Sequence, residues 1–168
     1  SKLKLVVNET KSRVCRASAC TFLSFTFPRG KIRWTKKAYA DFRYRLKRLT
    51  GRSWGVSMAY RMTKIAQYIR GWMGYFRISE YYTPINSIDE WLRRRLRMCY
   101  WKQWCKPRTR IRNLIKLGMP PRAAISVGLS RKSYWRLSRT LPTNAGLGNQ
   151  FLADHGLPNI KAIWCSYH

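Results

Sequence analysis

Carboxylates and histidines are the side chains that could support acid–base or metal chemistry, and both are scarce in this sequence. Two-metal phosphoryl transfer needs several carboxylates that converge on cations. The six acids are instead scattered along the 168 residues, at Glu9, Asp41, Glu80, Asp89, Glu90 and Asp154. We interpret Asp154-His155 as a helix end, where a histidine suits the dipole. There is no phosphate-binding glycine loop and no Gly-x-Ser-x-Gly or His-Glu-x-x-His motif. We therefore expect no catalytic residue, metal ligand or cofactor in this chain.

The five cysteines predict free thiols rather than a disulfide framework or a zinc site. Their number is odd, and no two of them have Cys-x-x-Cys spacing, which zinc sites commonly use. Free thiols persist in reducing compartments. We therefore expect a cytoplasmic protein, of a bacterial or an organellar kind.

Cations dominate the composition. Lys and Arg number 35 and Asp and Glu number six, which gives a net formal charge of +29. The excess positive charges repel one another, and binding of a polyanion relieves this repulsion. Cations alternate with aromatic residues in 91–106 and 131–139; phosphates bind cations, and unpaired bases stack on aromatic rings. An anionic membrane is the weaker alternative, because the apolar helix faces carry enough Trp and Tyr to build a shared core. We expect a nucleic-acid partner and no membrane.

The elements that must position these side chains are predicted to be mainly α-helical. Residues 1–34 should form strands, with Leu3, Leu5 and Val7 alternating along one strand and the loop at 28–30 closing a hairpin. From about Thr35 the apolar spacing becomes three or four residues, which predicts three long helices. A smaller helical cluster follows Pro107, which suits the first turn of a helix.

Local signals set the expected helix ends. Gly51 is expected to end the first long helix in a left-handed conformation, and Ser57 is expected to cap the start of the second. The run Ser87-Ile88-Asp89-Glu90 resembles a capping box that begins the third. Gly71 and Gly74 suggest that another backbone approaches the second helix closely.

Several short segments rich in Gly, Trp and Arg follow one another in a distinctive order. They are RLTGRSWGVS at 48–57, RGWMGYF at 70–76, DEWLRRRLR at 89–97, WKQW at 101–104, RTRIRNL at 108–114 and WRLS at 135–138. In this order they resemble the C-terminal portion of group II intron-encoded reverse transcriptase/maturases. Phe22-Leu23-Ser24-Phe25 is similar to the last strands of the family's reverse transcriptase domain. Family members usually have Gly where this chain has Ser24.

The resemblance implies a division of the chain into three parts. Residues 1–34 would be terminal strands of a reverse transcriptase palm, 35–106 the maturase-specific or thumb helices, and 107–168 a basic, DNA-binding-like helical region. The implied fold is a short β-hairpin, then a three-helix thumb-like bundle, then a small helical cluster. The family's catalytic Tyr-Ala-Asp-Asp element, where Mg²⁺ would act, lies upstream of this portion. Tyr39-Ala40-Asp41-Phe42 shares its first three residue types with this element. It lies in a predicted basic helix, however, so we do not identify it with the catalytic element.

The resemblance also implies a function and partners. Such proteins bind their own intron RNA, assist its splicing and copy it during retrohoming. The expected partners are group II intron RNA, target-site DNA or an RNA/DNA hybrid, and an upstream reverse transcriptase domain. Three alternatives remain open: an inactive truncated remnant of an intron-encoded RNA-directed DNA polymerase, a general nucleic-acid-binding protein, and the thumb of an active polymerase.

The candidate nucleic-acid-binding residues are mostly cations of the predicted helices. They are Lys36, Lys37, Arg43, Arg45, Lys47, Arg48, Arg52, Ser53, Arg93, Arg94, Arg97, Lys102, Lys106, Arg108, Arg110 and Arg112. We assign five residues to packing: Trp72, Tyr75, Phe76, Trp91 and Leu96. Trp101 and Trp104 could serve either role. Reversing the charges of Arg94 and Arg97 is expected to weaken RNA binding and leave the thermal melt nearly unchanged.

Overall fold

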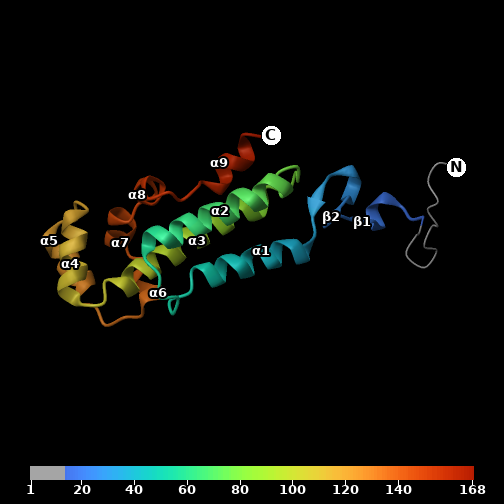
Figure 1. Cartoon of the computed structure of the whole chain (residues 1–168). Helices are drawn as coiled ribbons and strands as arrows, with labels where there is room; N and C mark the ends of the chain where they lie inside the picture. Colours follow the sequence, from blue (N-terminus) through green and yellow to red (C-terminus); the bar gives the residue numbers. More distant parts are fainter. Residues whose placement is uncertain (1–13) are drawn as a thin grey trace.

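The structure is a computed structural model that describes residues 14–168. In this part of the chain a small antiparallel sheet is followed by helices, so the predicted mainly α fold class is confirmed. The strands are β1 (Thr21–Phe22), β2 (Phe25–Thr26) and β3 (Arg33–Trp34), with 3-10 turns η1 (Ala17–Ala19) and η2 (Pro28–Gly30). The sheet lies at one end of three long helices, and α4 and α5 lie at the other end (Figure 1). The strand predicted at Leu3, Leu5 and Val7 falls outside the described residues.

Phe22–Phe25 forms a tight hairpin of its own, which the sequence pattern did not predict. Strand β1 pairs with β2 through Phe22 and Phe25, and the turn between them holds Leu23 at φ 47° and Ser24 at φ 67°. Two consecutive left-handed residues match the twist of a two-residue hairpin, but they favour Gly or Asn over other residues. The predicted loop at 28–30 does join β2 to β3.

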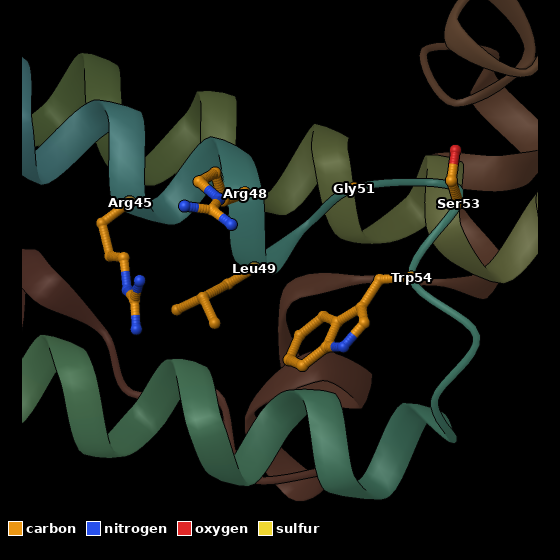
Figure 2. A pocket seen from close by; sticks show the side chains of 6 residues that line it. All are labelled: Arg45, Arg48, Leu49, Gly51, Ser53 and Trp54. Atoms are coloured by element: carbon orange, nitrogen blue, oxygen red, sulfur yellow. The ribbon is translucent and has the colours of Figure 1, made fainter.

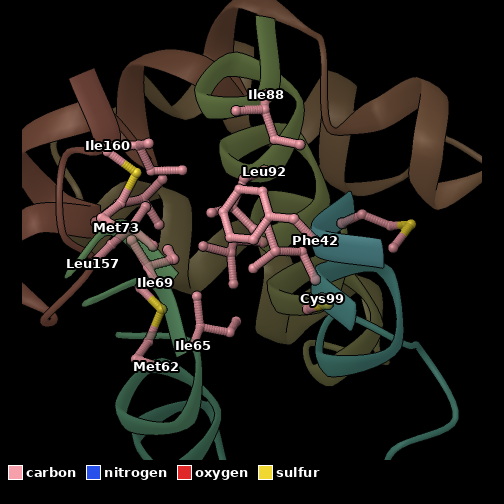
Figure 3. Packing of buried hydrophobic residues seen from close by; sticks show 14 of the residues in the cluster. Phe42, Met62, Ile65, Ile69, Met73, Ile88, Leu92, Cys99, Leu157 and Ile160 are labelled. Carbon is pink, nitrogen blue, oxygen red and sulfur yellow. The ribbon is translucent and has the colours of Figure 1, made fainter. Parts of the chain in front are cut away.

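Three long helices form the body of the protein: α1 (Lys36–Leu49), α2 (Met58–Phe76) and α3 (Thr83–Gln103). Thr35 and Ser57 cap the first two, since each hydroxyl accepts a hydrogen bond from the backbone N–H three residues later. The apolar stripes at spacings of three and four meet in one core, which Figure 3 shows. Its fully buried members include Phe42, Leu46, Met62, Ile65, Ile69, Met73, Leu92 and Leu96.

The start of α3 differs from the prediction. The helix begins at Thr83, with Pro84 in its first turn, where the missing N–H of proline has no helical partner to lose. Asp89 is therefore inside the helix, where it is buried and forms an ion pair with Arg93. The predicted capping box at 87–90 is wrong, because the helix had already started one turn earlier.

Two predictions about glycines are also wrong. Gly51 lies outside the left-handed region. The end of α1 is instead closed by the Thr50 N–H, which donates to the Leu46 carbonyl, and the Gly51 N–H donates to the Arg48 carbonyl. Gly71 and Gly74 face open space, with no other backbone near them.

The last third of the chain forms a second cluster and then returns to the bundle. Its helices are α4 (Pro107–Lys116), α5 (Pro121–Gly128), α6 (Tyr134–Leu137), α7 (Leu141–Gly146), α8 (Asn149–Asp154) and α9 (Ile160–Cys165). One core cluster contains Trp101, Leu114, Ala124, Val127 and Leu137. Leu147, Leu152, Leu157 and Ile160 belong instead to the core of the long helices. Helices α7 and α8 are separated at Gly148, which lies at the N-cap position of α8.

Trp72, Phe76, Trp91 and Leu96 pack in or against the core of the long helices, as assigned. Tyr75 was assigned with them but is 48% exposed, and its hydroxyl donates to the Leu23 carbonyl at 2.9 Å. Trp72 stacks on Phe42 with ring centroids 4.1 Å apart and on Phe76 at 4.4 Å. Trp101, left undecided by the sequence, is fully buried, and its indole N–H donates to the Thr143 hydroxyl at 3.1 Å. Trp104 is half-buried against both cores.

Candidate nucleic-acid interface

Helix α1 presents a strongly basic face to solvent. Phe42 and Leu46 turn into the core, and the six cations of the helix are all exposed: Lys36, Lys37, Arg43, Arg45, Lys47 and Arg48. Six cations and one acid, Asp41, give this helix a net charge of 6 − 1 = +5. We call this surface the α1 basic face. Among residues 14–168 its side chains form no ion pair, the one ion pair found there being Asp89–Arg93.

The loop from α1 to α2 is fixed by a buried arginine. Arg61, 3% exposed, donates from one guanidinium nitrogen to the carbonyls of Leu49 and Gly51, at 2.7 and 3.0 Å. Its other terminal nitrogen donates to the Trp54 carbonyl at 2.9 Å. Helix C-termini carry partial negative charge, so a cation is favourable there. This explains why α1 ends at this position without a glycine in a left-handed conformation.

A second arginine joins α3 to the same helix end. Arg95 donates to the hydroxyl and the carbonyl of Thr50 and to the carbonyl of Lys47. Thr50 itself is fully buried, and its hydroxyl also donates to the Leu46 carbonyl at 2.7 Å. The guanidinium therefore fixes the end of α1 against the middle of α3.

Next to this loop lies a cleft, which we call the junction cleft. It has a volume of about 520 Å³ and is lined by Arg45, Arg48, Leu49, Gly51, Ser53 and Trp54. Figure 2 shows Arg45, Leu49 and Trp54 reaching into the space between the end of α1 and helix α2, while the Ser53 hydroxyl points away. The cleft thus combines two guanidinium groups with an indole ring.

The arginines of α3 have a different environment from those of α1. Arg93 is partly buried and is the ion-pair partner of Asp89. Arg94 donates to the Trp135 carbonyl at 3.1 Å and lies over the Trp135 ring, 3.8 Å from its centroid. Arg97 donates to the Leu147 carbonyl at 2.9 Å. Burial lowers the pKa of Arg94 and of Arg97, and neighbouring Arg139 and Arg93 lower it further.

These contacts correct the expectation that Arg94 and Arg97 are surface residues without structural roles. Both hold the returning C-terminal segment against α3, so charge reversal there should lower the melting temperature as well as any RNA affinity. The sequence could not reveal this, since their partners lie 41 and 50 residues further along the chain.

The remaining candidates lie at the start of the C-terminal part. Lys102, Lys106, Arg108 and Arg112 are exposed. Arg110 is 8% exposed and donates to the carbonyls of Trp104 and Cys105 at 3.0 and 2.9 Å. Arg110 therefore closes the end of α3 as Arg61 closes the end of α1. Its side chain is buried rather than exposed at the surface, where the candidate set had placed it.

A second basic cleft joins the two halves of the chain. Arg52, on the α1–α2 loop, lines it together with Arg131 and Lys132, which precede α6. Arg52 was a candidate, but Arg131 and Lys132 were missing from the candidate set. The signal for them was the alternation of cations and aromatic residues over 131–139.

The structure confirms that Asp154-His155 is a helix end. His155 follows the last residue of α8, and its ring nitrogen Nδ1 lies 2.7 Å from the Phe151 carbonyl. Among residues 14–168, no three His, Cys, Asp or Glu side chains lie close enough together to hold a metal ion. Within the same residues, no helix has the length and apolar character needed to cross a membrane.

The comparison with protein families identifies one region of the chain. Residues 39–118 match the family described as the group II intron, maturase-specific domain. This region runs from the first turn of α1 to just beyond the end of α4. It contains the junction cleft and the four arginine and lysine residues of the α1 basic face from Arg43 onward, while Lys36 and Lys37 precede it. No curated protein matches the chain.

Proposed function

We propose that this chain binds group II intron RNA through the α1 basic face and so assists splicing. The match of residues 39–118 to the group II intron, maturase-specific domain supports this proposal. The observation that carries the proposal is the set of six exposed cations on one helix of 14 residues, with none held in an ion pair among the described residues. Cations spaced along one exposed helix can neutralise successive phosphates of an RNA backbone.

The exposed cations beyond α1 support a second contact within the same function. Lys102, Lys106, Arg108 and Arg112 lie on or near α4, and Arg131 and Lys132 face Arg52 across the second basic cleft. We infer that this surface contacts target-site DNA or an RNA/DNA hybrid during retrohoming. We also infer that the protein acts with a reverse transcriptase domain, encoded upstream, that supplies the Mg²⁺-dependent polymerase site. An in-frame polymerase sequence upstream would support this inference, and a frameshift or stop codon there would favour an inactive remnant.

The test of RNA binding compares two triple variants of equal net charge. One replaces Lys36, Lys37 and Lys47 by Gln, and the control replaces the exposed Arg70, Lys116 and Arg122 by Gln. Each lost phosphate contact should reduce the slope of log affinity against log salt by roughly 0.7–0.9. We therefore expect the α1 triple to lose about two to three units of slope and the control to lose much less. Equal losses would mean that binding depends on total charge and not on the α1 basic face.

Specificity is tested by competition at raised salt, at about 200 mM, where binding driven by charge alone weakens. Labelled group II intron RNA from the source genome competes with scrambled RNA of equal length. Preference for the intron supports a maturase-type role. Equal binding that collapses with salt would favour a general nucleic-acid-binding protein.

A further inference from the structure

We propose that the junction cleft binds one unpaired nucleotide of an RNA, with the base against Trp54 and the adjoining phosphates against Arg45 and Arg48. This inference rests on the proposed function, because it names the feature of the RNA that the basic surface would select. An α-helical face of cations can hold any backbone, but a cleft with an aromatic wall can distinguish a base that is free to enter it.

The aromatic wall is formed by the part of the Trp54 indole that its neighbours leave uncovered. The guanidinium of Arg61 lies over the ring at 5.0 Å from its centroid, and Tyr60 meets it edge-on at 6.1 Å. The indole also lines the cleft and is half-buried. Unpaired bases commonly stack on such rings. The contact between the Arg61 cation and the indole ring also helps to hold Trp54 in place.

The cations stand at the correct place for the phosphates on either side of that base. Arg45 and Arg48 are three residues apart on α1, which places them on neighbouring positions of one helix face. Both are exposed and both line the cleft. In Figure 2 the Arg45 side chain lies on the same side of the α1 end as Leu49 and Trp54. Guanidinium groups can bind phosphate oxygens in a bidentate manner.

The cleft is already formed by contacts within the protein. Arg61 binds the carbonyls of Leu49, Gly51 and Trp54, and therefore fixes both the apolar and the aromatic wall. A site that needs little ordering loses less affinity on binding. Its volume of about 520 Å³ falls in the range of small-ligand sites, roughly 300–1,000 Å³.

A base inside a duplex cannot enter this cleft, because both of its faces are covered by stacked neighbours. The preferred ligand is therefore a bulged or loop nucleotide beside a helical segment, whose backbone continues along the α1 basic face. This combination also explains why the aromatic ring and the basic helix occur at the same corner of the protein.

The experiment uses the full chain and three RNA duplexes of one sequence: a perfect duplex, the duplex with one bulged adenosine, and the duplex with an abasic residue at the bulge. We expect the wild type to bind the adenosine bulge roughly 5- to 140-fold more tightly than the abasic bulge, the range expected for one stacked base. Trp54→Leu should remove this preference and leave the affinity for the perfect duplex within about twofold. The matched control is Tyr44→Leu, an exposed aromatic residue of α1 that does not line the cleft.

A spectroscopic measurement on the wild type keeps the test valid if Trp54→Leu folds poorly. With 2-aminopurine at the bulge, stacking on Trp54 should quench its fluorescence when the protein binds, and unchanged fluorescence in a bound complex would overturn the proposal. Equal wild-type affinities for all three duplexes would also overturn it, while leaving the proposed RNA binding intact. Failure to bind any of the RNAs would instead refute the proposed function.

Discussion

Arg61 offers the most direct test of how this protein is held together. Its guanidinium is 3% exposed and donates three hydrogen bonds to three carbonyls around the α1–α2 loop. The substitution Arg61→Gln removes the guanidinium group that donates to all three carbonyls. We expect the free energy of unfolding to fall and the junction cleft to lose its shape.

The magnitude follows from the kind of bonds that are lost. A hydrogen bond to a charged group contributes about 1.5–3 kcal/mol, so three would suggest as much as about 9 kcal/mol. Two effects reduce this sum. The buried cation carries its own desolvation cost, including an Nε–H with no partner among the described residues. The loop carbonyls can also turn to water once released. We therefore expect a net loss of about 3 kcal/mol, or a melting temperature lower by roughly 6–12 °C for a chain of this size.

The assay is equilibrium urea unfolding followed by circular dichroism, without RNA and at fixed salt. The control, Arg70→Gln, makes the same chemical change at an exposed position of the same helix and should alter stability by less than about 0.5 kcal/mol. A loss below about 1 kcal/mol for Arg61→Gln, or equal losses for both variants, would refute the conclusion that Arg61 closes the end of α1.

Three further changes follow from the same structure. Ser24→Gly should raise the free energy of unfolding by about 1 kcal/mol, because φ is positive there; an unchanged or lower urea midpoint would contradict the left-handed turn. Arg97→Glu should lower the free energy of unfolding by about 2 kcal/mol, since it breaks the hydrogen bond to the Leu147 carbonyl. An unchanged melting temperature would mean that Arg97 has no structural role. Burial raises the pKa of Tyr100 to about 12, and its unfolded value is about 10. The folded state therefore holds this proton more tightly, and stability should fall as pH rises from 10 towards 12. Tyr100→Phe should show a shallower fall over that range, and parallel curves for both proteins would be evidence against the raised pKa.

The sequence predicted those features whose causes are local. The cap at Ser57 depends on a hydroxyl and an N–H three residues apart, and it formed as expected. Thr35 caps α1 in the same way, although the sequence analysis named it only as the place where the helical spacing begins. Pro107 opens α4 for a similar reason. The capping box at 87–90 failed even though its pattern is local, because Pro84 allowed the helix to begin earlier. Such patterns predict that a residue can cap a helix, but not that a helix must begin there.

The division of the arginines into exposed and interior residues could not be predicted. Arg94, Arg95 and Arg97 are neighbours in a run of identical charge, and the sequence alone treats them as one polar face. Their actual partners are the end of α1 for Arg95 and the returning C-terminal segment for the other two. These contacts depend on how distant segments pack, which helical spacing does not determine. For the same reason Arg110, expected at the surface, is buried.

The scarcity of acids explains a pattern that runs through the whole fold. With six Asp and Glu for 35 cations, a buried arginine in this protein rarely has a carboxylate to meet. Arg61, Arg95 and Arg110 bind carbonyls at the ends of α1 and α3 instead. Helix C-termini supply partial negative charge without an acidic side chain, so the interior cations are compensated by the backbone.

This arrangement has a consequence for the surface. Because the backbone compensates the interior arginines, no acidic residues need to be placed near them. The six exposed cations of α1 then outnumber its single acid, Asp41, and retain a net attraction for an external polyanion. An acidic partner for Arg45 or Arg48 would also repel phosphate from the junction cleft. The same device that closes the helix ends therefore leaves Asp41 as the single acid of α1. It also separates the interior arginines that hold the helix ends from the exposed cations of α1 through which we propose that RNA binds.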